Sequence, residues 1–168
     1  SISSVQRHID ALKKKGFIKS EKYQNRSLDI LGNTLNIPLV GNVACGLPIY
    51  AEENIEAYIP YPNTKINKNK DYFFLRAIGD SMNETNIKGK NIDDGDFVLV
   101  EKTNTAEIGS IIVALMEDEA TIKRLEKGEG YVILKPESRN TNNKPIICLQ
   151  EPLIQGVVVD VVKKGGDD

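Results

Sequence analysis

Two short runs contain the residues that could do covalent chemistry. Residues 77–82 (Ala-Ile-Gly-Asp-Ser-Met) include Ser81, and residues 120–125 (Ala-Thr-Ile-Lys-Arg-Leu) include Lys123. A serine hydroxyl becomes an effective nucleophile when a neighbouring base removes its proton. The chain's one histidine, His8, lies in a basic segment far from any glycine-rich serine turn, which argues against a Ser-His-Asp triad. A lysine can replace that histidine if it is neutral, and neutrality requires burial among apolar groups.

The alternation around Lys123 favours such burial. Thr121, Lys123 and Leu125 share one face if the run is a strand, and we expect that face to be buried. A simpler interpretation of Ser81 also stands, because Gly-Asp-Ser is an ordinary turn sequence whose serine hydrogen-bonds the local backbone. The two runs alone therefore leave open whether Ser81 is a nucleophile or a turn residue.

Length and composition predict a globular protein with one domain of common size and a small appendage. The chain has 168 residues, of which 40% are hydrophobic, so it can bury a core. No apolar run approaches the roughly 20 residues that span a bilayer, and no leader pattern is visible, so we expect a cytoplasmic protein without a membrane partner. Cys45 and Cys148 match neither a redox nor a zinc spacing. We expect two reduced thiols, no metal and no cofactor.

Charge is distributed unevenly along the chain. Residues 1–31 contain seven basic and three acidic residues, a net charge of +4, whereas residues 32–168 contain 15 basic and 21 acidic residues, a net charge of -6. A basic arm on an acidic body indicates a polyanion as the partner of the arm, although a solvated helix face has the same composition.

The arm has the pattern of a helix followed by a hairpin. Apolar residues recur at helical spacing in residues 2–15, and two short apolar runs flank a turn in residues 17–31. This is the order of the second half of a winged helix, so we expect residues 1–31 to be the C-terminal part of a truncated winged-helix domain. The residues expected to contact DNA in the major groove are Ser3, Ser4, Gln6 and Arg7. The alternative is that these are solvated polar residues of an amphipathic helix.

The rest of the chain predicts an α+β protein dominated by antiparallel β structure. After a linker at 32–36, a domain at 37–168 contains seven β-branched runs that predict a barrel-like or folded sheet. These runs are 72–77, 97–100, 110–116, 120–125, 131–134, 146–149 and 154–162. Turns are expected at 117–119 and 128–130, and at the acidic run 93–96, where a calcium loop is the weaker alternative. The apolar run 157–162 is expected at a sheet edge, where it pairs two subunits, unless it is a central core strand.

Taken in order, several motifs resemble those of the LexA-type repressors. The matching pieces are residues 5–16 (a recognition helix), 37–46 (a self-cleavage region), 79–82 (Gly-Asp-Ser-Met), 94–96 (Asp-Gly-Asp) and 121–125 (Thr-Ile-Lys-Arg-Leu). The resemblance implies a dimeric repressor of DNA-damage (SOS) genes that binds operator DNA. It further implies that the protein cuts its own hinge when a RecA–single-stranded DNA filament stabilises the cleavable form.

In that family pattern Ser81 attacks, Lys123 is the base, and the bond cut is Cys45-Gly46. The chain departs from the pattern in lacking the first helices of the winged helix, in having cysteine before the cut bond, and in a longer 83–91 segment. Other hypotheses are a repressor that does not cut itself, a self-processing protein like UmuD, and a free protease related to signal peptidases.

Overall fold

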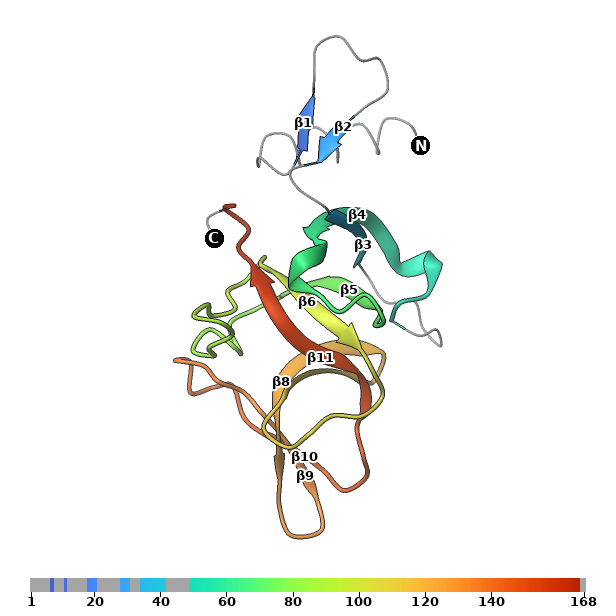
Figure 1. Ribbon diagram of the computed structural model, residues 1–168. Coiled ribbons are helices and arrows are strands. Elements are labelled where there is room, and N and C mark those ends of the chain that lie inside the picture. Colours follow the sequence, from blue (N-terminus) through green and yellow to red (C-terminus); the bar gives the residue numbers. More distant parts are fainter. Residues whose placement is uncertain are drawn as a thin grey trace.

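The computed structural model describes residues 7, 11, 18–20, 28–30, 34–41 and 49–166. Within these residues the chain forms one two-stranded sheet and one nine-stranded sheet (Figure 1). The small sheet consists of β1 (Ile18–Ser20) and β2 (Leu28–Ile30). The large sheet consists of β3 (Thr34–Val40), β4 (Ile55–Pro62), β5 (Tyr72–Arg76), β6 (Phe97–Lys102), β7 (Ile111–Met116), β8 (Glu119–Lys127), β9 (Val132–Lys135), β10 (Ile146–Cys148) and β11 (Leu153–Val162). Two short 3-10 turns, Glu52–Asn54 and Asn63–Lys65, flank β4.

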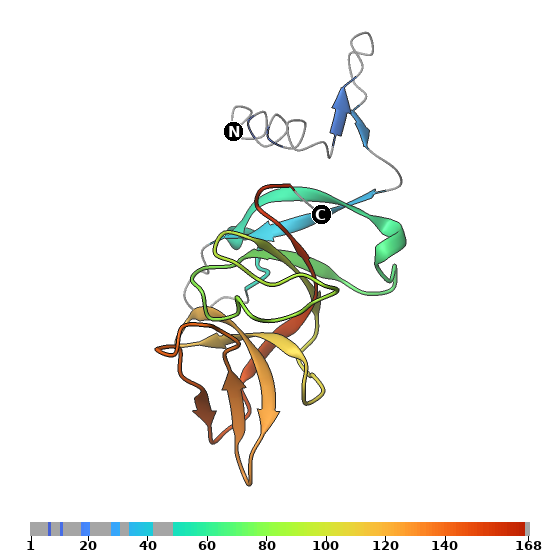
Figure 2. The same ribbon diagram turned by 90° about the vertical axis from the view of Figure 1, so that its left-hand side faces the viewer.

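The large sheet has the strand order β10-β9-β8-β7-β11-β6-β5-β3-β4. All its neighbours are antiparallel except β3 and β5, which pair in parallel over two residues. Register shifts interrupt β11 in two places, and such bulges bend a strand and increase its twist. The sheet is accordingly folded into two curved halves, as the two views show (Figures 1 and 2). The predicted, mostly antiparallel β domain is confirmed.

Local sequence explains how β7 and β8 meet. Glu117 and Asp118 form the two-residue connection and both have positive φ, at 48° and 67°. Positive φ at both central residues gives a turn whose twist matches that of the flanking strands. The predicted turn at 117–119 is thus confirmed, and it fixes a register that pairs Ile112 of β7 with Lys123 of β8.

The sheet includes two strands that the sequence did not predict. β3 begins at Thr34, three residues before the expected domain start at Ile37, so residues 34–36 pair with β4 instead of forming a linker. β4 was not predicted because it contains prolines, which are uncommon in strands. Because β4 is an edge strand, Pro60 and Pro62 are tolerated there without breaking a central ladder.

The run 157–162 lies in the middle of the sheet, which makes its predicted edge position wrong. β11 runs between β7 and β6, and Val158, Val161 and Val162 are buried. Its apolar residues therefore pack in the core of one subunit. The alternative of a central strand is the correct one.

Three apolar clusters form the core. The one beneath the candidate site includes Val40, Ile49, Phe73, Met82 and Ile122. Cys148 is a free thiol and is buried in another cluster, as expected for a reduced cysteine, whereas Cys45 lies outside the described residues.

The N-terminal arm is described only in part. β1 and β2 pair antiparallel, as the predicted hairpin requires, and Arg7 and Ala11 are helical and exposed. Ser3, Ser4 and Gln6 lie outside the described residues, so the winged-helix assignment stays a prediction. In the described part of the chain no helix is long and apolar enough to cross a membrane.

Candidate active site

Ser81 lies on a turn that follows β5. Gly79, two residues earlier, has a φ of 81°, a conformation that glycine adopts without strain. The Gly79 N–H donates to Oδ1 of Asp94 at 2.7 Å, and Ala77 exchanges backbone hydrogen bonds with Gly95 and Asp96. The acidic run 93–96 is therefore a turn, as expected, and it fixes the approach to the serine.

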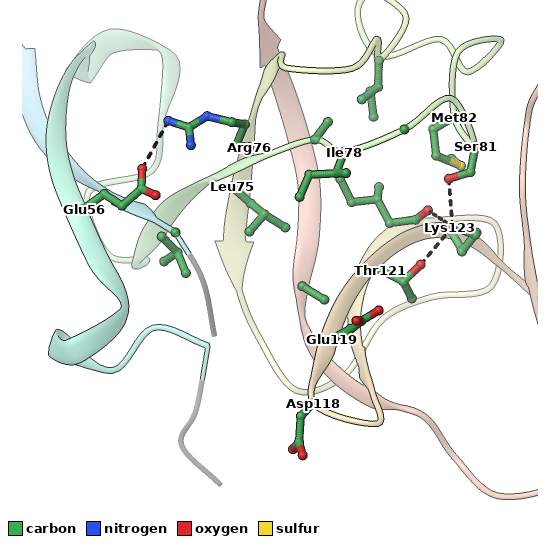
Figure 3. Close-up of a pocket in the computed structure, with 17 residues that line it drawn as sticks. Glu56, Leu75, Arg76, Ile78, Ser81, Met82, Asp118, Glu119, Thr121 and Lys123 are labelled. Carbon is green, nitrogen blue, oxygen red and sulfur yellow. Dashed lines mark hydrogen bonds and ion pairs between the residues drawn. The ribbon is translucent and has the colours of Figure 1, made fainter. Parts of the chain in front are cut away.

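Lys123 extends from β8 toward this turn. Its Nζ lies 2.9 Å from Oγ of Ser81, 2.9 Å from Oγ1 of Thr121 and 3.0 Å from the carbonyl oxygen of Ile122 (Figure 3). The lysine is only 9% exposed, so the predicted burial of this face is confirmed at Lys123 and also at Leu125. Burial in turn lowers the pKa of the Lys123 ammonium below its usual range, because it disfavours the charged form.

The three contacts of Lys123 can be satisfied by a neutral amine as well as by an ammonium. A neutral amine has two N–H donors and one lone pair. The Ile122 carbonyl can only accept, and the Thr121 hydroxyl can accept the second N–H. In the neutral form the lone pair is left for the proton of the Ser81 hydroxyl, whereas in the protonated form Nζ donates to Oγ. This arrangement can transfer the serine proton to the lysine and so generate a nucleophilic oxygen.

The pair opens into a cleft of about 510 Å³. One side of the cleft carries the ion pair between Glu56 and Arg76, with 3.2 Å between Oε2 and Nη2, and the β7–β8 turn lies at another side (Figure 3). Ile78, 86% exposed, and Gly41 also line the cleft. Gly41, the last described residue before the predicted cut, therefore lies at the cleft that contains Ser81.

Asn54 holds both described flanks of that segment. Its backbone oxygen accepts from the Gly41 N–H at 2.8 Å, and its Nδ2 donates to the Ile49 carbonyl at 3.2 Å. Asn54 is only 3% exposed, and Val40 and Ile49 are buried in the same apolar cluster. The two flanks are thus fixed close to each other.

The structure brings together two of the predicted site residues, Ser81 and Lys123. Cys45 and Gly46 lie outside the described residues. Sequence reasoning missed the roles of Asp94, Asn54 and Glu137, which position parts of the site through hydrogen bonds. Only Asp94 had a signal, since it belongs to a motif already singled out; the contacts of the other two depend on the tertiary fold.

Comparison with known proteins agrees with this architecture. The family described as Peptidase S24-like matches residues 38–159, which include β4 to β10, the Ser81 turn and Lys123. The fold and this match place the domain in the general class of self-cleaving serine peptidases.

Relatives extend the similarity over nearly the whole chain. A LexA repressor of Clostridium botulinum (strain Okra / Type B1) is 40% identical, in an alignment that covers 98% of this chain and 80% of the relative. A LexA repressor of Clostridium kluyveri is 35% identical with the same coverage. The chain therefore belongs to the peptidase S24-like family and, within it, to the LexA-type repressors.

Proposed function

We propose that this chain represses DNA-damage (SOS) genes and inactivates itself by cutting its Cys45-Gly46 bond, with Ser81 as nucleophile and Lys123 as general base. The observation that carries the proposal is the 2.9 Å separation of Ser81 Oγ and a desolvated Lys123 Nζ in an open cleft. A serine and a buried lysine at this distance are the two groups that acyl transfer requires.

The chemistry proceeds in two steps. Neutral Lys123 takes the Ser81 proton as Oγ attacks the carbonyl carbon of Cys45. The tetrahedral intermediate collapses when the C–N bond to Gly46 breaks and the new amine takes the proton from Lys123. Water, deprotonated by Lys123, then attacks the Ser81 ester. The acyl C–O bond to Oγ breaks, Lys123 returns its proton to Oγ, and Cys45 leaves as a carboxylate after its acid proton passes to solvent. Backbone N–H groups around Ser81 are the candidates for holding the oxyanion, a contribution typically worth about 3–4 kcal/mol.

The proposed substrate is a segment of the same chain. Gly41 lines the Ser81 cleft, and Asn54 fixes Gly41 and Ile49 beside each other. Substrate and catalyst in one chain replace a binding step with a high effective concentration, worth roughly 7–11 kcal/mol if the geometry is near attack. The proposed trigger is a RecA–single-stranded DNA filament that favours the docked form of this segment.

The proposed DNA partner is operator DNA, bound by two subunits of a cytoplasmic homodimer. The basic charge of residues 1–31 and the β1–β2 hairpin support a DNA-binding arm, and Ser3, Ser4, Gln6 and Arg7 are the proposed base contacts. Two half-sites require two arms, so sedimentation velocity should reveal dimers whose fraction rises with concentration. A monomer at every concentration would contradict this part of the proposal.

Incubation of the purified chain, followed by mass spectrometry, tests the central proposal. We expect the wild type to yield fragments 1–45 and 46–168, faster with RecA filament than without, and Ser81→Ala and Lys123→Ala to stay intact. Undiminished cutting in Ser81→Ala, or a cut at another bond, would refute the assignment. An intact wild type, even with filament, would favour a repressor that does not cut itself.

A further inference from the structure

Strand pairing does not fix the distance between Ser81 and Lys123. Ser81 follows β5 and Lys123 belongs to β8, and in the sheet order β6, β11 and β7 separate these two strands. A small change in sheet curvature would therefore separate Oγ from Nζ. A more direct link must hold the turn with the serine against the strand with the lysine.

Glu137 provides such a link. Its backbone N–H donates to the Ser81 carbonyl at 2.9 Å, and its backbone oxygen accepts from the Glu84 N–H at 2.8 Å. Its carboxylate receives two hydrogen bonds from Arg124, one from Nε to Oε1 and one from Nη2 to Oε2, the latter at 3.1 Å. Arg124 is the neighbour of Lys123 on β8. One residue thus connects the backbone of the nucleophile's turn with the strand of the base.

The loop around Glu137 binds the same turn at further points. We call residues 136–145, between β9 and β10, the support loop. The Asp80 carboxylate accepts from Nδ2 of Asn143 at 2.9 Å and of Asn140 at 3.0 Å, and these bonds lower its pKa. Oδ1 of Asn83 accepts from the Arg139 N–H at 3.1 Å. The loop therefore contacts the turn on both sides of Ser81.

The ion pair between Arg124 and Glu137 is better shielded from solvent than another ion pair of β8. The Arg124 and Glu137 side chains are 28% and 23% exposed, whereas those of Lys135 on β9 and Glu126 on β8 are 49% and 35% exposed. Arg124 meets its partner with two parallel hydrogen bonds, a geometry that fixes orientation as well as distance. Neither Lys135 nor Glu126 has a hydrogen bond to the Ser81 turn among the described contacts.

We propose that Glu137, held by Arg124, is a positioning residue that sets the separation of Ser81 Oγ and Lys123 Nζ for self-cleavage. The proposal rests on the proposed function of that pair. Glu137 does not touch the reacting atoms, and its effect passes through the Ser81 backbone. Loss of the ion pair should therefore lower the cleavage rate even when all the lysine is neutral.

The test measures the first-order rate of self-cleavage of the full chain across pH and compares the plateau reached when Lys123 is neutral. Glu137→Gln keeps the backbone contacts and removes the charge, and we expect its plateau to fall about ten- to a hundredfold, as displacements of about 1 Å do. Arg124→Glu combined with Glu137→Arg should regain most of that loss. Glu126→Gln is the matched control and should keep the wild-type plateau.

The plateau of the cleavage rate distinguishes a positioning effect of Glu137 from a change in the pKa of Lys123. A substitution that changed only the Lys123 pKa would move the midpoint of the pH profile and leave the plateau unchanged. A wild-type plateau in Glu137→Gln, or an equal fall in Glu126→Gln, would overturn the proposal while leaving the proposed function standing. Crystal structures give a readout that needs no activity: in Glu137→Gln we expect Oγ and Nζ beyond hydrogen-bond distance, and an unchanged separation would refute the inference.

Discussion

Raising the pH should accelerate self-cleavage, because Lys123 can accept the Ser81 proton only when it is neutral. Burial lowers the pKa of Lys123, so the neutral fraction becomes large below the usual lysine range. Protonated Lys123 cannot accept the Ser81 proton, and the protonated fraction falls as the pH rises through the lowered pKa. We expect a rate that climbs with pH and then levels off.

The size of the effect follows from the titration. An ordinary lysine with a pKa of about 10.4 would be neutral in only about one molecule in a thousand near neutral pH. Each unit by which burial lowers the pKa raises that fraction about tenfold, until the lysine is mostly neutral. Below the midpoint the rate should therefore rise about tenfold per pH unit, and the midpoint itself should lie below about 10.4.

The assay follows the loss of intact chain from about pH 6 to about pH 11, with circular dichroism at each pH to confirm that the protein stays folded. Lys123→Arg is a demanding control, because arginine stays protonated throughout this range and should be inactive at every pH. A pH-independent rate would remove Lys123 as the titrating base. A midpoint at or above about 10.4 would contradict the effect of burial.

Three further predictions concern the support of the site and the order of the reaction. Asn54→Ala should lower the free energy of unfolding by about 1–3 kcal/mol in chemical denaturation, since the buried Ile49 carbonyl loses its donor. Gly156→Ala should lower the free energy of unfolding by about 1–3 kcal/mol or more, because the added Cβ would lie 2.4 Å from a methyl carbon and 2.5 Å from a backbone oxygen of β6. Gly165→Ala is the control: a Cβ there meets open space, so the free energy of unfolding should change by less than about 0.5 kcal/mol. Spontaneous cleavage should be first order, with a half-life that does not change on dilution; a rate constant proportional to protein concentration would show cutting between chains.

Short-range patterns were sufficient to predict most strands. β-branched residues between turns correctly located β5 to β11, and the Glu117-Asp118 turn was recognisable from its neighbours. Sheet order was not predictable, because it depends on contacts between distant segments. The same limit explains the wrong edge position of 157–162: an apolar run has the same sequence in a central strand as at an exposed edge.

The same distinction between short-range patterns and tertiary contacts applies to the candidate site. The sequence motifs identified Ser81 and Lys123, and the structure adds what holds them. Asn54 and Glu137 each combine backbone contacts with a side-chain contact, and no sequence motif marks either residue. The contact of Glu137 with Ser81 joins segments that lie far apart along the chain, and only the folded sheet reveals it.

The geometry bears on how such a protein could be regulated. Ser81 and Lys123 are already within hydrogen-bond distance, and the lysine is already desolvated, so little of the chemical apparatus remains to be assembled. In the proposed function the rate is then the product of the neutral fraction of Lys123 and the fraction of chains whose 42–48 segment is docked in the cleft. The pH acts on the first factor and a filament acts on the second, by at most its differential affinity for the two forms. A docked segment would also displace water from the cleft and lower the Lys123 pKa further, which would make the two factors reinforce each other. Control of docking alone would therefore be sufficient to switch a site that is otherwise complete.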